Sequence, residues 1–395
     1  MKEFSPDEIK YLLAHENEDL NRLLLQASRY PHLPVPLLVQ HIRARQKIKN
    51  KLPTWYQHPQ VRYPAMVSVE QSSSEKTAAF KAELVSGNLL LDLTGGLGLD
   101  SFFFSDKFKK VIYLERQPEL VEIAAHNAQV LGNTNIEFRQ GEASAFLDDF
   151  TSQADWIYLD PARRDEANRK VFNLTDCEPD VVQLLPKLLA KGKNILIKTS
   201  PMLDISQALG QLESVQKVYV VAVDNECKEV LYHVAASENP NLQVETINLS
   251  AGVSKQTFTF DYAAEENAPV TYTLPQTYIY EPNAAILKAG GFKSLAKYYG
   301  LNKLHRNSHL YTSEGLVPDF PGRIFKLRTI SRYQKKELAC HLPDSKANIT
   351  VRNFPDSVAA IRKKTGLKEG GDIYLFATTD LNAKPIILIC EKVLL

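Results

Sequence analysis

Cysteine is scarce in this chain, with four residues among 395 and no Cys-x-x-Cys pair. This spacing excludes a disulfide framework and a cysteine-based zinc site, so we expect reduced thiols, no bound metal and a cytoplasmic protein. Long apolar stretches are also missing: no run approaches the roughly 18 residues of a membrane span, and we expect no signal peptide. Internal repeats and low-complexity segments are absent as well, which leaves a globular chain of roughly two or three domains.

Charge is balanced overall but divided along the chain. The formal net charge is +1, yet from Glu281 onward 19 Lys and Arg outnumber 10 Asp and Glu, whereas the residues before it have 28 against 36. Such a basic part favours a polyanionic partner such as nucleic acid. Residues 41–63 also contain six Lys and Arg, no acid and three aromatics. This segment could hold a phosphate backbone and stack bases, or equally be a solvated helix face with an apolar anchor.

Short apolar strands alternate with helical segments in the middle of the chain. The expected strands cover residues 89–93, 111–114, 156–159, 195–198 and 218–223. Helical patterns lie between them, for example at 118–131 and 180–190. Alternation of this kind predicts an α/β fold with a doubly wound, Rossmann-like and mostly parallel sheet that carries helices on both faces. In such sheets, ligands bind beyond the carboxyl ends of the strands.

The flanking parts have different patterns. Ser5-Pro6-Asp7-Glu8 has the form of a capping box with proline at the first helical position, which predicts a helical N-terminal segment. Period-two alternation predicts antiparallel strands at 243–249, 256–262 and 270–274, and a helix follows at 282–299, interrupted by Gly290-Gly291. We therefore expect four parts: a helical segment at 1–71, the sheet domain at 72–237, a strand-rich linker with a small module at 238–319, and a small α+β domain at 320–395.

A glycine-rich turn, DLTGGLG at residues 92–98, follows the first expected strand. A phosphate-binding nucleotide loop would need Lys-Ser or Lys-Thr after its last glycine, but Leu99-Asp100-Ser101 follow instead. A dinucleotide fingerprint would need Gly or Ala where Ser101 stands. The acid Asp92 would repel a pyrophosphate and suits a ligand that carries an ammonium and a sulfonium. This pattern favours S-adenosylmethionine over NAD or ATP.

Two more acids follow strands at matching places. Glu115 ends the second expected strand, where a carboxylate can accept both ribose hydroxyls of an adenosine. Glu142 follows the strand expected at 136–139, where a polar side chain could reach the adenine amine. Each acid alone could be a helix cap or a surface residue, but their order and spacing together favour the cofactor site.

On these motifs, residues 72–234 resemble a class I S-adenosylmethionine-dependent methyltransferase. The resemblance implies that the turn holds the methionine part of the cofactor, Glu115 the ribose and Glu142, where an Asp is more usual, the adenine. It implies these cofactor-binding residues: Asp92, Thr94, Gly95, Gly96, Gly98, Glu115, Arg116, Glu142 and Ala143. YIYEPN at 278–283 and GRIF at 322–325 extend the similarity to bacterial proteins that add a ferredoxin-like module and a C-terminal THUMP-like domain.

The expected strand at 156–159 ends in Asp160-Pro161-Ala162-Arg163-Arg164. This resembles the Asp-Pro-Pro-Tyr motif of methyltransferases that act on base amino groups, in which a carboxylate and a carbonyl accept hydrogen bonds from the target nitrogen. A guanidinium in place of the aromatic ring can also stack on a base or bind phosphate. The resemblance implies that Asp160, Pro161 and Arg163 are the catalytic residues.

The remaining candidates on the acceptor side are less marked. Methylation of a uridine carbon would need a cysteine nucleophile, and Cys177 is the nearest in sequence. Lys198, at the end of the strand at 195–198, could meet a phosphate or a carboxylate, or be an ordinary surface lysine.

We therefore expect a methyltransferase that modifies RNA at an amino or ring nitrogen of a purine. Structured RNA is the expected partner, because THUMP domains of related enzymes bind it. A methyltransferase for protein or small molecules, and a non-catalytic RNA-binding scaffold, are the alternatives.

Overall fold

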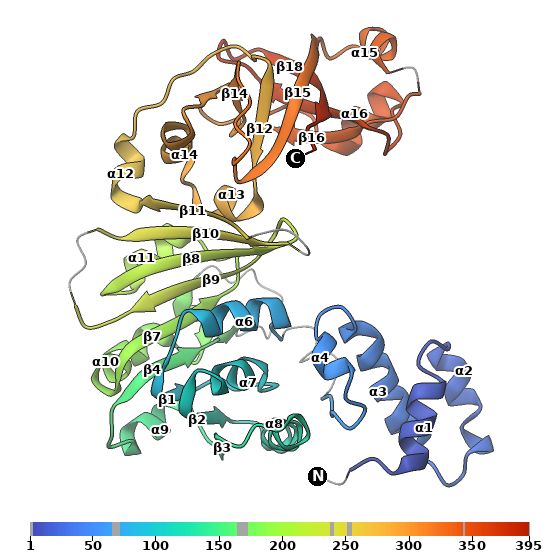
Figure 1. The fold of residues 1–395 in the computed structure, drawn as a ribbon, viewed down its shortest axis with the longest axis vertical. Helices are drawn as coiled ribbons and strands as arrows, with labels where there is room; N and C mark the ends of the chain where they lie inside the picture. The colour runs from blue at the N-terminus through green and yellow to red at the C-terminus, as the bar shows by residue number, and fades with distance from the viewer. Residues whose placement is uncertain are drawn as a thin grey trace. The chain divides into compact units, whose positions relative to one another are not determined.

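The computed structural model describes residues 3–64, 72–163, 173–237, 241–250, 255–342 and 344–394 (Figure 1). The chain forms two compact units. The first unit comprises Met1–Gln216 and Val230–Asn239, and the second Lys217–Glu229 and Pro240–Leu395. Within the described residues, no helix has both the length and the apolarity that crossing a bilayer demands.

The first unit contains the expected doubly wound sheet. Five strands run parallel in the order β3-β2-β1-β4-β7, and the part of β9 that belongs to this unit, residues 230–234, is antiparallel beside β7. Their bounds are β1 (Gly87–Asp92), β2 (Phe108–Glu115), β3 (Ile136–Gln140), β4 (Ala154–Leu159), β7 (Gly192–Thr199) and β9 (Glu226–Val234). The chain moves outward from β1 to β2 and β3, then returns to place β4 on the other side of β1. The topological switch point therefore lies between β1 and β4.

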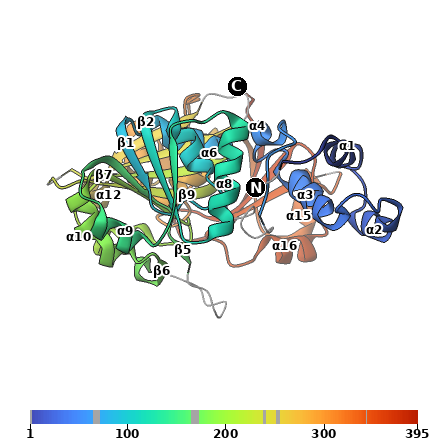
Figure 2. The same ribbon diagram turned by 90° about the horizontal axis from the view of Figure 1, so that it is seen from below.

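Helices cover both faces of this sheet, as the alternating pattern predicts. Figures 1 and 2 show α8 (Pro118–Leu131) on one side of the strands and α10 (Val181–Lys191) on the other. The central strands are buried from both sides, which explains their continuous apolar sequences. The other helices of this sheet domain are α6 (Glu75–Glu83), α7 (Leu99–Ser105), α9 (Ala143–Asp149) and α11 (Ile205–Gln211).

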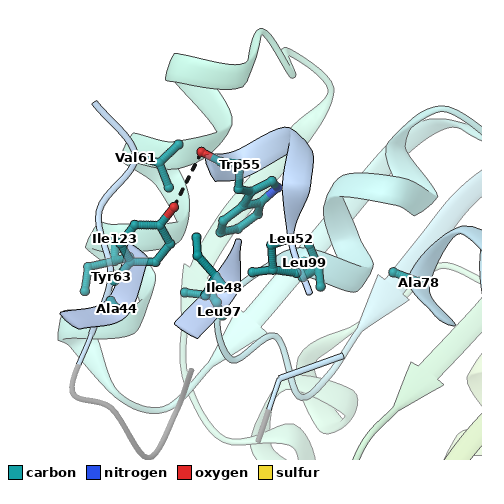
Figure 3. Packing of buried hydrophobic residues seen from close by; sticks show 10 residues of the cluster. All are labelled: Ala44, Ile48, Leu52, Trp55, Val61, Tyr63, Ala78, Leu97, Leu99 and Ile123. Atoms are coloured by element: carbon teal, nitrogen blue, oxygen red, sulfur yellow. Dashed lines mark hydrogen bonds between the residues drawn. The ribbon is translucent and has the colours of Figure 1, made fainter. Parts of the chain in front are cut away.

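The N-terminal segment is helical, with α1 (Pro6–Ala14), α2 (Leu20–Leu25), α3 (Val35–Ile48) and α4 (Pro53–Tyr56). The predicted capping box is present, because Ser5 and Glu8 exchange side-chain and backbone hydrogen bonds at the start of α1. Figure 3 shows how the segment joins the sheet domain: Trp55 and Tyr63 pack in one cluster with Leu97 and Leu99 from the glycine turn. The N-terminal helices thus support the turn from outside.

Part of the basic and aromatic segment at 41–63 is buried rather than available for nucleic acid. Trp55 and Tyr63 are 1% and 3% exposed, and Arg45 is 3% exposed beside Glu16, at 3.0 Å between Nε and Oε1. Arg62 is buried with its guanidinium over the Phe4 ring. For these residues the base-stacking interpretation is wrong, because tertiary packing turns their long side chains inward against aromatic rings.

The second unit contains most of β8 (Val215–Val223), with β10 (Gln243–Leu249) parallel beside it and β11 (Gln256–Asp261) antiparallel to β10. The expected antiparallel pair is therefore confirmed, but the strand expected at 270–274 is wrong. That segment forms only one isolated bridge, from Tyr272 to Lys303, because none of its alternating side chains is buried. Short α12 (Tyr262–Asn267) lies between these segments.

The C-terminal part of the second unit is a seven-stranded sheet in the order β13-β14-β12-β15-β18-β17-β16. Its longer strands are β12 (Tyr278–Pro282), β15 (Gly322–Ser331), β16 (Asn348–Arg352), β17 (Ile373–Thr379) and β18 (Pro385–Lys392). The short strands are β13 (Asn302–Lys303) and β14 (Tyr311–Ser313). The expected helix break is confirmed, since α13 (Ala284–Ala289) ends at Gly290 and α14 (Phe292–Tyr299) begins after Gly291. The remaining helices, α15 (Lys335–His341) and α16 (Val358–Thr365), share a core with β17.

A buried carboxylate connects three strands of this sheet. Glu281 on β12 is 2% exposed and pairs with Arg323 on β15 and with Arg352 on β16, at 2.9 Å for the second pair. Two guanidiniums around one carboxylate satisfy its oxygens, which is the condition under which a buried charge is tolerated.

We expect Trp55→Ala to lower the free energy of unfolding of the first unit by about 3–5 kcal/mol, because it empties the cluster between the N-terminal helices and the glycine turn. Trp156, on β4 of the same unit, is the only other tryptophan and reports unfolding in denaturant by its fluorescence. Leu25→Ala is the control, since that side chain is 86% exposed and its loss should leave stability unchanged. An equally stable Trp55→Ala variant would contradict the support role.

Candidate active site

The glycine turn links the end of β1 to the start of α7. Asp92 is the last residue of β1, and Gly98 precedes α7 in a left-handed conformation with φ 84°. The turn is closed by a hydrogen bond from the Gly98 N–H to the Gly95 carbonyl at 2.8 Å. It is held against β2 by the Gly95 N–H, which donates to the Leu114 carbonyl at 2.9 Å.

Tyr113 explains the first glycine of the turn. A Cβ atom at Gly95 would lie 2.2 Å from the Tyr113 ring, so the backbone is pressed against that ring and no larger residue fits. The Tyr113 hydroxyl then donates to the Gly96 carbonyl at 2.6 Å. Gly95 is therefore required because the turn packs directly against the Tyr113 ring. The sequence did not predict this role of Tyr113.

Asp92 is a buried carboxylate with few partners. It is 1% exposed and accepts hydrogen bonds from the Ser101 hydroxyl at 2.6 Å and from the Thr94 N–H at 3.2 Å. Its pKa is raised to about 7, mainly by burial and also by the charges of Asp100 and Asp160, while the two hydrogen bonds act in the opposite direction. A positively charged ligand group beside this carboxylate would restore its ionised form.

Glu115 and Glu142 lie after neighbouring parallel strands, as predicted. The Glu115 carboxylate accepts the Gly96 N–H at 3.0 Å and the Gln117 N–H at 2.9 Å. Glu142 immediately precedes α9 with its side chain exposed and not capping the helix, and Ala143 is buried behind it. The Arg116 side chain pairs instead with Glu178 at 2.7 Å, at the exposed surface.

Asp160 brings the acceptor side next to the turn. Its N–H donates to the Thr94 hydroxyl at 2.6 Å, so the residue after β4 is fixed to the turn after β1. Its carboxylate forms an ion pair with Lys198 on β7, which agrees with the carboxylate alternative for that lysine. Pro161 is buried. The structure therefore places Asp160 at the switch point beside the glycine turn.

The last residues of the acceptor motif form a short strand. Ala162–Arg163 (β5) pairs antiparallel with Cys177–Glu178 (β6). The Arg163 side chain and Arg164 lie outside the described residues. Cys177 is buried, with its sulfur 3.8 Å from the Asn173 carbonyl, so its thiol does not present itself as a nucleophile.

The side chains and backbone groups around the glycine turn suit the methionine and adenosine parts of S-adenosylmethionine. Such a ligand would need a carboxylate for its ammonium, backbone groups for its methionine part and a second carboxylate for its ribose; Asp92, the partly exposed backbone at residues 94–96 and Glu115 are groups of these kinds. No group of three or more His, Cys, Asp or Glu side chains among the described residues is arranged to hold a metal ion.

Family models match the C-terminal part of the chain, residues 278–392. Residues 278–321 match a family model described as a ferredoxin-like domain, and residues 322–392 one described as THUMP domain-like. The whole chain is similar to a crystal structure from Porphyromonas gingivalis W83 described as a "putative methyltransferase". The two are 34% identical, each is covered over 100% of its length, and the TM-score is 0.89.

Curated relatives match about a third of this chain or less. An "uncharacterized RNA methyltransferase" of Bacillus cereus is 30% identical over 31% of this chain and 28% of its own length. A "tRNA/tmRNA (uracil-C(5))-methyltransferase" of Nautilia profundicola is 30% identical over 27% of this chain and 33% of its own length. The chain thus spans about a third or less of these two relatives.

We expect Gly95→Ala to lower the free energy of unfolding by about 1–3 kcal/mol, because the new methyl group collides with the Tyr113 ring. Gly210→Ala is the matched control: it lies in α11 with nothing within 4 Å of its Cβ position. That change should leave stability unchanged or raise it by up to about 1 kcal/mol, as alanine favours helix. Thermal or denaturant melts of both variants make the comparison, and equal stabilities would contradict the close packing.

Proposed function

Because this chain belongs to the family of methyltransferases in which ferredoxin-like and THUMP-like domains accompany a Rossmann-like domain, we propose that it transfers a methyl group from S-adenosylmethionine to RNA. The observation that carries the proposal is the contact between the glycine turn, where the cofactor would bind, and Asp160, where the acceptor would bind. The Asp160 N–H donates to Thr94 in the turn that follows Asp92, so an acceptor held by Asp160 would meet a donor held by that turn.

On the donor side, Asp92 would hold the ammonium of the methionine part, beside the backbone of Thr94, Gly95, Gly96 and Gly98. Glu115 would accept the ribose hydroxyls, in exchange for part of its present contact with the Gly96 N–H. Glu142 and Ala143 would border the adenine, with Arg116 at the outer edge of the site. When bound, the cofactor supplies an activated methyl group on a sulfonium, so alignment of the nucleophile provides much of the rate.

On the acceptor side, we propose a purine nitrogen as the nucleophile. The Asp160 carboxylate would accept a hydrogen bond from the amine, and the ion pair with Lys198 would hold that carboxylate in place. Pro161 would set the direction of the backbone carbonyl, with Arg163 beside it. The relatives' names do not favour a purine, since one names uracil C5. A carbon acceptor would need a thiolate, however, and Cys177 is buried.

RNA as the substrate class draws support from the relatives named as RNA methyltransferases and from the THUMP-like domain. Exposed lysines occur near the α15–α16 end of that domain: the Lys335 ammonium would lie 3.7 Å from a Cβ atom at Gly366, and an isolated β-bridge joins the backbones of Lys346 and Lys368. Exposed cations of this kind bind phosphate without sequence preference.

The test is transfer of labelled methyl from S-adenosylmethionine to total RNA and total protein from a host that lacks the gene. We expect label in RNA, and a fall of roughly 10²-fold with Asp160→Asn because the acceptor loses a charged hydrogen-bond partner. Asp149→Asn, at the exposed end of α9, is the control and should leave the rate unchanged.

Nucleoside digestion of the labelled RNA then identifies the base. A methylated purine supports the nitrogen acceptor, whereas 5-methyluridine would overturn it and direct attention to Cys177. Label in protein alone would overturn RNA as the substrate. No label anywhere, with S-adenosylhomocysteine still bound, would favour a small-molecule enzyme or a non-catalytic scaffold.

A further inference from the structure

A lysine is completely buried behind the glycine turn. Lys81, on α6, is 0% exposed, and lysines are almost never fully buried unless they are paired. Its ammonium lies 3.1 Å from an Asp100 carboxylate oxygen and 2.9 Å from the Ser73 hydroxyl. The sequence did not identify this residue, although a lysine inside the apolar stretch TAAFKA is its signal.

Asp100 connects this lysine to both halves of the site. It lies in the first turn of α7, directly before Ser101, whose hydroxyl holds Asp92. The Asp100 carboxylate also accepts the Tyr158 hydroxyl at 2.8 Å, and Tyr158 is on β4, two residues before Asp160. These hydrogen bonds and the ion pair therefore link α6, the start of α7 after the glycine turn, and β4.

The charges of this region explain why a lysine is needed. Asp92 is faced by Asp100 from α7 and by Asp160 after β4, and both raise its pKa. Asp100 is faced by two cations, Lys81 from α6 and Lys198 from β7. Burial alone would raise the pKa of Asp100, but these two cations and the hydrogen bond from Tyr158 hold it below its usual value.

Glu115 completes the charged groups around the turn. Its carboxylate is held on the other side by the Gly96 and Gln117 N–H groups. Among the described residues, Asp100 and Asp160 raise the pKa of Asp92, and Lys81 and Lys198 are the cations that act on Asp100. Loss of Lys81 would leave Asp92 and Asp100 close together with one of these two cations fewer.

We propose that Lys81 is a positioning residue of the cofactor site, whose charge allows Asp92 and Asp100 to be ionised together so that Asp92 can accept the cofactor's ammonium group. This inference rests on the proposed function, which assigns Asp92 to the methionine part. Lys81 acts through Asp100 and α7 and does not itself touch the cofactor.

The direction in which the pH midpoint of ligand binding moves separates this role of Lys81 from simple structural support. Affinity for the cationic group should rise with pH as Asp92 ionises, with a midpoint near its pKa of about 7. Removing Lys81 leaves the acids one positive charge short, so the midpoint moves up. Removing the Asp100 charge leaves Lys81 in excess, so the midpoint moves down. General damage to the fold would weaken binding in both variants without opposite shifts.

The experiment is calorimetric titration of the full chain with S-adenosylhomocysteine, which carries the same ammonium, from about pH 6 to about pH 9. We expect Lys81→Met to raise the midpoint by roughly one pH unit and to weaken binding about fivefold at pH 7. Asp100→Asn should lower the midpoint by a similar amount. Lys76→Met, an exposed lysine on the same helix, should leave the curve unchanged.

The double variant Lys81→Met with Asp100→Asn keeps the inference testable if either single variant unfolds. It removes a buried pair rather than one partner, which proteins tolerate far better, and its midpoint should return close to that of the unchanged protein. Midpoints that do not move, or that move in the same direction in both single variants, overturn the role of Lys81 while the proposed function stands. An unchanged protein that does not bind S-adenosylhomocysteine overturns the proposed function, and this inference with it.

Discussion

The contact between the glycine turn and β2 is the constraint on which the rest of the site depends. Three successive residues of β2 hold the turn: the Tyr113 ring receives Gly95, the Leu114 carbonyl accepts its N–H, and the Glu115 carboxylate accepts the N–H of Gly96. Because the turn cannot shift along the strand, α7 starts at a fixed place. That start in turn fixes the side chains that hold Asp92 and that connect to β4.

The cost of this arrangement is a concentration of acids where water is largely excluded. Asp92 ends β1 and Asp100 lies in the first turn of α7, on the two sides of the glycine turn, and Asp160 follows the neighbouring strand β4. Lys81 and Lys198 approach from α6 and β7 and offset this charge. Under the proposed function, this excess of acid would favour a cationic ligand, because the ligand's own charge would complete the neutralisation. Methyl transfer from a sulfonium needs alignment more than proton transfer, so these charged groups would serve binding.

Elsewhere in the chain too, the partners of a charged side chain decide whether it is available to bind a ligand. Arg45 and Arg62 look like nucleic-acid contacts in the sequence, but they lie buried against Glu16 and Phe4. Arg323 and Arg352 belong to the basic C-terminal part, yet both pair with the buried Glu281. The positive charge left for the proposed RNA substrate is therefore smaller than the sequence count indicates, and it includes exposed lysines such as Lys335 and Lys346.

The sequence by itself determined the doubly wound sheet, the turn after β1, the acids at the ends of β2 and β3, and the break at Gly290-Gly291. Each of these depends on patterns within a short window, where strand period, helix period and turn chemistry act locally. Only the tertiary structure decided that 270–274 lacks a buried face, that Tyr113 demands Gly95, and that Lys81 meets Asp100. Lys198 and Asp160 are 38 residues apart, and Glu281 and Arg352 are 71 apart. Such pairs form only because strand order brings distant chain segments together, and no local pattern contains that order.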